Sequence, residues 1–174
     1  MTLANRPTIV LVGPMGAGKS TVGRHLAELL HWNFLDSDRE LEARCGADIP
    51  WIFDIEGESG FRRRETLIIK ELVAEPHTVL ATGGGAILAK ENRTLIKSAG
   101  VVIYLTAPVD ELFQRVIKDK TRPLLQVENP RETYEHIFNQ RDPLYREVAS
   151  TVIVTDNYSS PLTVAQSILD QIDR

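Results

Sequence analysis

Five short apolar segments alternate with segments of helical period along this chain. The apolar segments are 8–12, 32–35, 78–81, 101–105 and 151–155. The fourth is apolar without alternation, as expected for a strand that is buried on both faces. Strands that alternate with helices predict a parallel sheet with helices on both of its faces. We therefore predict an α/β fold with five parallel strands.

The segments between these strands carry apolar residues at helical spacing, and Pro, Asp or Gly stands at most of their ends. Asp38 could cap a helix that begins at Arg39, and Pro143 is expected to end or kink the helix that begins at Arg131. The expected helices are the segment containing Val22 to Leu30, then 39–46, 48–57, 59–75, 90–99, 108–117, 131–143 and 161–172.

A glycine-rich stretch, Gly13 to Thr21, joins the first predicted strand to the first helix. Its spacing is that of a phosphate-binding loop, in the strand-loop-helix context that this motif requires. Backbone N–H groups would point at a polyphosphate on the helix N-terminus, Lys19 would reach the β and γ phosphates, and Ser20 would hold Mg²⁺. The residues expected to bind a nucleoside triphosphate are Gly16, Ala17, Gly18, Lys19, Ser20 and Thr21.

Composition narrows the classes of function. The 174 residues, 43% of them hydrophobic, predict one globular domain with a substantial core. A net charge of −4 argues against nucleic acid as the main partner. Cys45 is the single cysteine, which excludes an internal disulfide and a cysteine-based metal site. Because the sequence has neither an apolar run of the ~18 residues that span a membrane nor a signal-peptide pattern, we expect a soluble, cytoplasmic protein.

Polar and glycine residues gather at the carboxyl ends of the predicted strands, the edge where open α/β sheets bind ligands. Asp36 and Asp38 alternate in what we expect to be an extended segment, so one could approach Mg²⁺ and the other a substrate hydroxyl. A simpler alternative is that Asp38 caps a helix and Asp36 is solvated. The run Gly83-Gly84-Gly85 suggests close approach of the backbone to a ligand, with a flexible loop as the alternative.

Arginines provide a further signal in a protein of net negative charge. Arg62 to Arg64 lie in one helical turn, so at most one or two of them can face a common site. Arg115, Arg122 and Arg141 stand beside helix ends or in the polar segment 118–129, a candidate mobile flap. Two guanidinium groups would suit a small anion. An inserted arginine such as Arg122 could contribute ~10³ to 10⁵ to the rate of phosphoryl transfer.

Together these motifs resemble those of the shikimate kinases over nearly the whole chain, from about Thr8 to the last helix. The phosphate loop alone is shared by many kinases, whereas the combination is much more specific. The matching segments are Gly13 to Thr21, Asp36-Ser37-Asp38, Phe61-Arg62-Arg63-Arg64-Glu65, Gly83-Gly84-Gly85, Arg122-Pro123-Leu124-Leu125 and Arg141-Asp142-Pro143-Leu144-Tyr145.

The resemblance implies ATP-dependent phosphorylation of the 3-hydroxyl of shikimate, which yields 3-phosphoshikimate and ADP in aromatic amino-acid biosynthesis. It implies that Asp38 binds the shikimate hydroxyls and is the general base, while Asp36 lies near Mg²⁺. It also implies that Arg62 and Arg141 pair with the shikimate carboxylate, together with the backbone at Gly84.

Further roles follow from the same resemblance. Glu65 would help to hold the substrate pocket, and Phe53 and Phe61 would form its apolar walls. Gly83 and Gly85 would join Gly84 in binding the substrate. The family's sheet has the strand order 2-3-1-4-5, and we expect the same order here.

On the nucleotide side, the resemblance places Arg122 on a lid that closes over ATP. Arg115 and the turn 156–160, including Asn157, would lie near the adenine. The helices of about 38–75 would bind the substrate, within a single kinase domain. We expect a monomer whose partners are small molecules, with no nucleic acid and no membrane among them.

Two other functions fit parts of this pattern. Another small-molecule kinase of the same fold, such as a gluconate kinase, would share the phosphate loop, but a neutral sugar would not need paired arginines. A nucleotide-dependent switch would also share the loop, but the chain has no Asn-Lys-x-Asp segment for reading guanine. A switch would also have no need of a second-substrate constellation.

Overall fold

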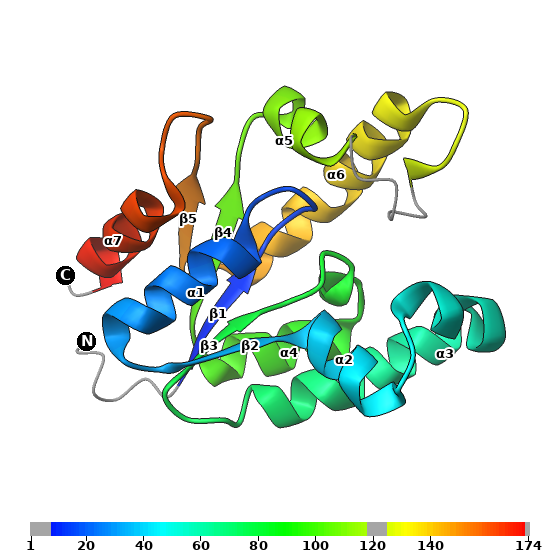
Figure 1. Cartoon of the computed structure of the whole chain (residues 1–174), viewed down its shortest axis with the longest axis horizontal. Helices are drawn as coiled ribbons and strands as arrows, with labels where there is room; N and C mark the ends of the chain where they lie inside the picture. Colours follow the sequence, from blue (N-terminus) through cyan, green and yellow to red (C-terminus); the bar gives the residue numbers. More distant parts are fainter. Residues whose placement is uncertain (1–7, 118–124, 173–174) are drawn as a thin grey trace.

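The computed structural model describes residues 8–117 and 125–172 and has a central sheet flanked by helices (Figure 1). The five strands are all parallel, in the order β2-β3-β1-β4-β5, which confirms the predicted order. The strands are β1 (Thr8–Val12), β2 (Asn33–Asp36), β3 (Thr78–Ala81), β4 (Gly100–Thr106) and β5 (Thr151–Val154).

Side chains of the central strand β1 point alternately into two hydrophobic cores. Ile9 and Leu11 belong to one core, and Val10 and Val12 belong to the other. All four are fully or almost fully buried. A strand in this position needs apolar residues on both faces, which explains why its sequence shows no polar alternation.

Helices complete the two cores on opposite faces of the sheet. One core takes side chains from α1, α5 and α7, the other takes them from α2, α3 and α4, and α6 contributes to both. None of the helices in the described residues is long and apolar enough to cross a bilayer. The helices are α1 (Lys19–Leu30), α2 (Ser37–Cys45), α3 (Ile49–Leu72), the 3₁₀ turn η2 (Ala86–Leu88), α4 (Lys90–Ala99), α5 (Val109–Val116), α6 (Pro130–Val148) and α7 (Pro161–Ile172).

The start of α2 differs from the predicted one. Asp36, at the end of β2, is the N-cap, and its Oδ1 accepts hydrogen bonds from the N–H groups of Asp38 and Arg39 at 3.1 and 3.3 Å. Asp36 is extended, as predicted, but Asp38 is inside the first helical turn, so the prediction that Asp38 is extended and the alternative that Asp38 caps the helix were both wrong. A carboxylate one residue before Ser37 satisfies the free N–H groups of the first turn better than one inside that turn.

Gly57 and Pro143 were each predicted to interrupt a helix, and the structure treats them differently. Gly57 has φ 69° and ψ 179° and breaks the helical path within α3, as predicted. Pro143, in contrast, lies inside α6, which continues to Val148, so the helix does not end there. The predicted end was therefore wrong, and Tyr145 and Val148, which follow Pro143, are 1% and 4% exposed. We attribute the continuation to this burial, which offsets the hydrogen bond that proline removes.

Candidate active site

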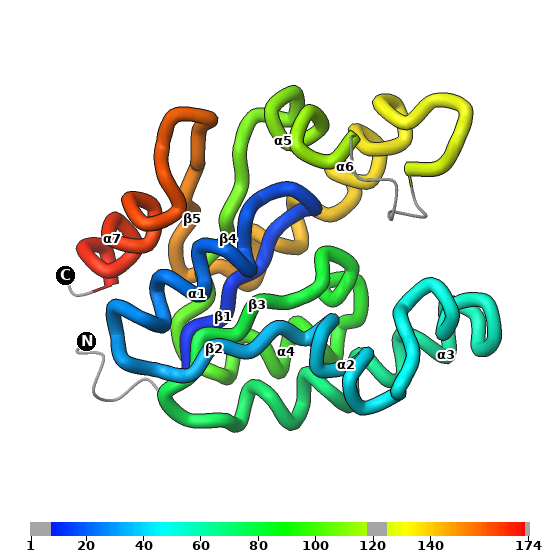
Figure 2. The backbone as a smooth tube through the Cα atoms, viewed as in Figure 1, coloured from blue at the N-terminus to red at the C-terminus, as the bar shows by residue number. Residues whose placement is uncertain are grey.

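The phosphate loop curls between β1 and α1, at the same end of the sheet as the loop after β3 (Figure 2). Gly18 has a left-handed conformation, φ 85°, which glycine adopts without steric cost. The Nζ of Lys19 donates to the carbonyl oxygens of Gly13 and Pro14 at 2.8 and 2.9 Å. The ammonium group is thus held over the loop, where phosphate oxygens would bind.

Ser20 and Asp36 meet beside this loop. The Ser20 hydroxyl donates to Asp36 Oδ2 at 2.5 Å, which brings a hydroxyl and a carboxylate together at the N-terminus of α1. Both are hard oxygen ligands of the kind that Mg²⁺ prefers. Among the described residues, no group of three or more His, Cys, Asp or Glu side chains is placed to hold a metal ion. Mg²⁺ bound with a nucleotide needs only one or two protein ligands, so this pair fits it.

Asp38 lies in the first turn of α2 and faces the loop after β3. Burial is the main reason that the pKa of Asp38 rises to about 6, and the charges of Asp36 and Glu65 raise it further. The charge of Lys19 acts in the opposite direction. A carboxyl group whose pKa lies near neutrality is suited to accept a proton during catalysis.

Two glycines of the loop after β3 leave room for charged groups. A Cβ on Gly83 would come within 2.5 Å of Asp38 Oδ1, and a Cβ on Gly85 would overlap the Arg62 guanidinium. The Gly83 N–H also donates to Ser37 Oγ at 3.0 Å. The glycine run is therefore a close approach between backbone and functional side chains rather than a general flexible linker.

Arg62 and Glu65 form an ion pair on α3. Arg62 Nη1 donates to Glu65 Oε2 at 2.7 Å, and Glu65 is only 2% exposed. Burial raises the pKa of Glu65, while the charges of Arg62 and Arg141 lower it in part. The Nε of Arg62 is buried and makes no hydrogen bond within the described part of the chain, but it forms a long ion pair with the exposed Glu58, Oε1 at 3.5 Å. A buried guanidinium N–H with only this long contact is suited to a ligand that accepts a hydrogen bond.

Arg141 reaches the same place from α6. It is 8% exposed, and its Nη1 would lie 3.7 Å from a Cβ on Gly84. The same point is 3.7 Å from the Met15 nitrogen in the phosphate loop. The two predicted anion-binding arginines and the glycine run therefore converge beside the phosphate loop.

The remaining residues of the arginine run point elsewhere. Arg63 and Arg64 are exposed, and Arg64 pairs with Glu56 at 2.6 Å, so both are surface residues as predicted. Phe53 and Phe61 stack with their ring centroids 4.6 Å apart, and the Arg62 guanidinium lies 5.1 Å from the Phe61 centroid. The predicted pair of aromatic walls is thus adjacent to Arg62.

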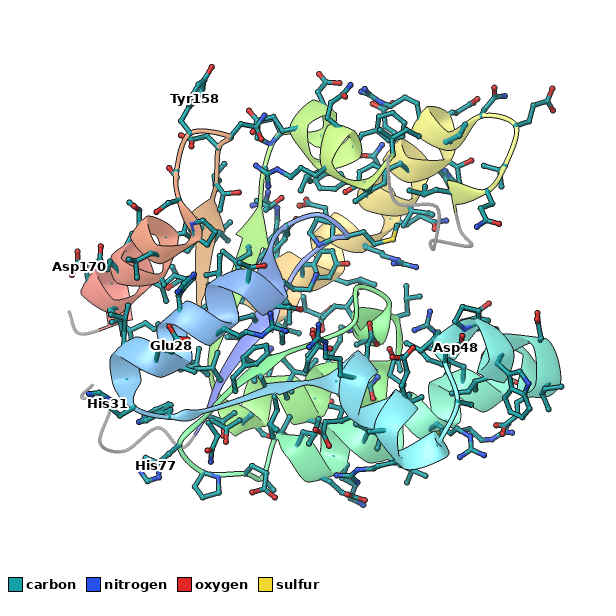
Figure 3. All side chains as sticks on the ribbon, in the orientation of Figure 1. Glu28, His31, Asp48, His77, Tyr158 and Asp170 are labelled. Carbon is teal, nitrogen blue, oxygen red and sulfur yellow. The ribbon has the colours of Figure 1, made fainter. Side chains whose placement is uncertain are left out.

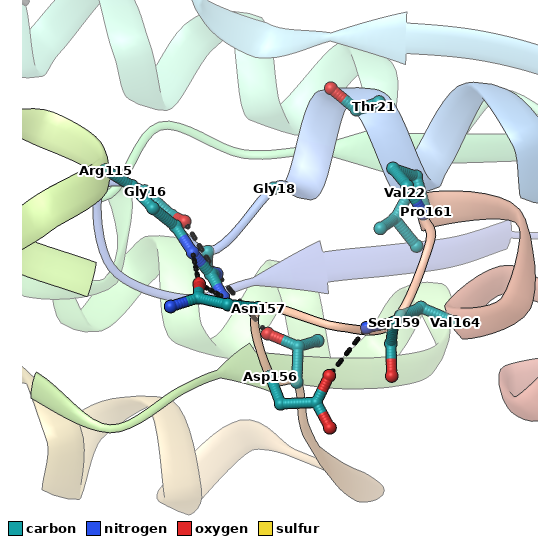
Figure 4. A pocket seen from close by; sticks show the side chains of 12 residues that line it. Gly16, Gly18, Thr21, Val22, Arg115, Asp156, Asn157, Ser159, Pro161 and Val164 are labelled. Carbon is teal, nitrogen blue, oxygen red and sulfur yellow. Dashed lines mark hydrogen bonds between the residues drawn. The ribbon is translucent and has the colours of Figure 1, made fainter. Parts of the chain in front are cut away.

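A second pocket of about 250 Å³ opens on the other side of the phosphate loop (Figure 4). It has both polar and apolar walls, as a nucleoside would require. Its lining comes from the phosphate loop and α1 (Gly16, Ala17, Gly18, Thr21, Val22), from α5 (Arg115), and from the β5–α7 connection and α7 (Thr155, Asp156, Asn157, Ser159, Pro161, Val164).

Arg115 links the walls of this pocket. Its Nη1 donates to the Gly16 carbonyl at 3.2 Å, and its Nη2 donates to Asn157 Oδ1 at 3.0 Å (Figure 4). Tyr158, in the middle of the same turn, is 96% exposed and points away from the protein (Figure 3). The turn therefore contributes Asn157 and Ser159 to the pocket but not the Tyr158 ring.

Arg122, expected on a lid over ATP, lies outside the described residues, as does most of the segment 118–129. Of that segment, Leu125 is buried and belongs to the core that includes β1 and α1.

Some residues contact the site in ways that were not predicted from the sequence. Thr155 lines the pocket beside the phosphate loop, and Ser37 ties the glycine run to α2. Tyr134 and Tyr145 donate to backbone carbonyls of Met15 and Gly84. The available signal was a tyrosine at a buried helical position, because a buried phenol needs a hydrogen-bond partner.

The fold and this edge of the sheet define a small-molecule kinase of the phosphate-loop class. A phosphate loop, the pocket beside it and a cluster of acidic and arginine side chains meet at the carboxyl ends of parallel strands. The model of the shikimate kinase family matches residues 15–173. The chain belongs to the shikimate kinase family, and ATP is its co-substrate.

Individual relatives agree with this assignment. The chain is 54% identical to a shikimate kinase of Actinobacillus pleuropneumoniae serotype 5b over 171 residues, which cover 98% of each chain. It is 52% identical to one of Shewanella loihica over 98% of this chain and 99% of that one. Its structure matches a shikimate kinase from Acinetobacter baumannii in complex with shikimate, with a TM-score of 0.93 and 55% identity over 98% of this chain and 94% of that chain.

Proposed function

We propose that this protein transfers the γ-phosphoryl group of ATP to the 3-hydroxyl of shikimate, which gives 3-phosphoshikimate and ADP. The observation that carries this proposal is the convergence of Asp38, Arg62 and Arg141 on the glycine run beside the phosphate loop. That arrangement offers one base, two cations for a carboxylate, and a neighbouring place for a triphosphate. Family membership supports the same reaction.

Asp38 is the proposed general base. It would accept the proton of the acceptor hydroxyl while the hydroxyl oxygen forms its bond to the γ-phosphorus, and ADP would leave with the electrons of the broken bond. Its raised pKa, set first by burial, gives it a proton affinity closer to that of the medium than an exposed aspartate has. The reaction needs its ionised form.

Arg62, Arg141 and the backbone of Gly83, Gly84 and Gly85 are the proposed carboxylate site. Arg62 already has one N–H paired with Glu65, and its buried Nε, which has only the long contact with the exposed Glu58 at 3.5 Å, would donate to the substrate. Glu65 would fix the guanidinium plane, since a fork that is held on one side loses less freedom when it binds a second anion. The helices α2 and α3 would thus supply most of the acceptor site, with Arg141 contributed by α6.

On the donor side, the proposed ATP contacts are the phosphate loop, Lys19, Arg115 and Asn157. Ser20 and Asp36 are the proposed residues that would hold Mg²⁺ with the nucleotide. When bound, the ion would neutralise charge on the β and γ phosphates. Arg122 stays a proposed contributor of positive charge, and it lies outside the described residues.

The proposed setting is a cytoplasmic monomer. Every residue assigned to either substrate comes from one chain, so the site needs no second copy. A net charge of −4 does not favour nucleic acid, and one cysteine suits a reducing compartment.

The direct test is ADP release in a coupled assay with ATP and Mg²⁺. We expect turnover with shikimate and only background without it. Gluconate and nucleoside monophosphates are the comparison acceptors. Faster turnover with gluconate would point to another kinase of this fold, and tight ATP binding without turnover of any acceptor would favour a nucleotide switch.

Loss of either carboxylate-binding arginine should act on the acceptor alone. A hydrogen bond to a charged group contributes about 1.5–3 kcal/mol, so Arg62→Lys and Arg141→Lys should each raise the KM for shikimate by about 10- to 100-fold. The KM for ATP should stay within threefold. Arg63→Lys is the matched control, because Arg63 is adjacent and exposed. Equal effects of Arg62→Lys and Arg63→Lys on shikimate kinetics would contradict the assigned pocket.

The pH profile should follow Asp38. Because its pKa in the free enzyme is about 6, kcat/KM for shikimate should fall about tenfold for each pH unit below that value. An ordinary exposed aspartate would leave the profile flat down to about pH 4. Initial rates between pH 5 and 8, with pH-stable coupling enzymes, measure the fall of kcat/KM on the acid side of the profile. A flat profile to pH 5 would argue against Asp38 as the base.

A further inference from the structure

One face of α6 carries three buried polar side chains. Tyr134, Arg141 and Tyr145 are seven and four residues apart, which places them on the same side of the helix. Their exposed fractions are 1%, 8% and 1%. Arg141 has a proposed substrate role, whereas the reaction described above gives the two tyrosines none.

Tyr145 holds the middle of the loop that follows β3. Its hydroxyl donates to the Gly84 carbonyl at 2.6 Å, and its ring packs on Tyr104 with centroids 5.0 Å apart. Burial raises the pKa of Tyr145 to about 12, so the phenol stays protonated and able to donate at neutral pH. The same loop lies against the Asp38 carboxylate at Gly83 and the Arg62 guanidinium at Gly85. A shift of Gly84 would therefore displace the groups on both sides of it.

Tyr134 makes the corresponding contact with the phosphate loop. Its hydroxyl donates to the Met15 carbonyl at 2.7 Å, and its ring lies against Phe113, with centroids 5.9 Å apart. The two tyrosines are eleven residues apart, about 16 Å along a helix with a rise of 1.5 Å per residue. The same helix thus donates one hydrogen bond to the phosphate loop and another to the loop after β3.

We propose that α6 sets the position of the loop after β3 relative to the phosphate loop. Tyr145 and Tyr134 are the positioning residues, and their hydroxyls hold Gly84 and Met15. The inference rests on the proposed function and deepens it. Phosphoryl transfer needs the acceptor oxygen and the γ-phosphorus close together and in line, so rate is sensitive to small displacements of either loop. Each hydroxyl donates to a backbone carbonyl, the Tyr145 hydroxyl also interacts with the Arg141 side chain, and neither tyrosine is assigned a contact with the reacting atoms.

The test compares Tyr145→Phe and Tyr134→Phe with Tyr104→Phe in the full chain. Tyr104 is a matched control because its ring stacks on Tyr145 but its hydroxyl donates to Asp142 Oδ1, at 2.7 Å, and not to either loop. Calorimetry gives the dissociation constants of shikimate alone and of ATP alone, and steady-state assays give kcat and both KM values. Thermal unfolding reports the loss of one buried hydroxyl in each variant.

The two tyrosine variants are expected to weaken the binding of different substrates. Tyr145→Phe should weaken shikimate binding about five- to tenfold and leave ATP binding within twofold, while Tyr134→Phe should do the reverse. Both should lower kcat about tenfold at saturation, since the spacing of the loops is disturbed. Tyr104→Phe should change all three quantities by less than twofold, even where its unfolding temperature falls as far.

Two results would overturn the proposal. One is that Tyr145→Phe has the kinetics of Tyr104→Phe; the other is that Tyr145→Phe weakens ATP and shikimate binding equally, as general loosening would. These failures differ from failure of the proposed function, in which the unmodified protein itself shows no shikimate-dependent ADP release. If Tyr145→Phe does not fold, Tyr134→Phe still tests the proposal, which fails if this variant has the kinetics of Tyr104→Phe or weakens ATP and shikimate binding equally.

Discussion

Asp38→Asn is expected to lower kcat with shikimate by about 10³, within the range of 10²–10⁴ that a general base contributes. Asparagine keeps the shape of the side chain and its place beside Gly83, but it cannot accept the hydroxyl proton. Binding of shikimate should change much less than kcat, because an amide can still hydrogen-bond a hydroxyl. Single-turnover assays with excess enzyme allow the small rate to be measured.

The same variant should be more stable than the unmodified protein above pH 6. The native carboxyl has the raised pKa, about 6 against 3.8, so the native state binds the proton more tightly and loses stability as pH rises between these values. A shift of this size equals about 3 kcal/mol, and partial exposure of Asp38 reduces the expected gain to about 1–2 kcal/mol at pH 8. Below pH 4 the gain should vanish.

The matched control is Asp54→Asn, which makes the same substitution at a carboxylate that is exposed on α3. It should change neither kcat nor the pH dependence of unfolding. Denaturant unfolding at pH 4 and pH 8 measures both variants. A loss of stability in Asp38→Asn at pH 8, with kcat reduced less than tenfold, would show that the carboxylate is structural rather than catalytic.

The sheet and the phosphate loop could be predicted from sequence because each leaves a strong local pattern. The strands at 8–12 and 101–105 are apolar on both faces, since a central strand contacts two cores. Glycines at fixed spacing before Lys19 have few other uses. The strand order, by contrast, followed only from the family resemblance.

The details of the acceptor site were harder to predict, because they depend on contacts between distant segments. Whether Asp36 or Asp38 caps α2 depends on a difference of one or two residues in where the helix begins. Tyr145 is 61 residues from Gly84, and no local pattern links them. The continuation of α6 past Pro143 likewise depends on tertiary burial rather than on helix propensity.

Lys19→Met is expected to reduce kcat/KM for ATP by about 10²–10³, the range seen when one donor to developing charge is removed. Methionine has a similar length but no charge, so the β and γ phosphates would lose the cation that is proposed to contact them. Lys70→Met is the matched control, because Lys70 is exposed on α3. Steady-state kinetics at several ATP concentrations provide the comparison, with shikimate saturating. A change under tenfold would remove Lys19 from the proposed donor site.

Lys19→Met should also shift the titration of Asp38, which connects the donor and acceptor halves of the site. The charge of Lys19 lowers the pKa of Asp38, so its loss should raise that pKa above about 6. Glu65 is the other buried carboxyl nearby; burial raises its pKa, Arg62 and Arg141 offset part of that rise, and Lys19 is not among the main charges that act on it, so its titration should be little affected. The pH dependence of shikimate binding, measured by calorimetry without turnover, therefore identifies the titrating group. If the midpoint does not move in Lys19→Met, that group is not Asp38, and the assignment of the base fails with it.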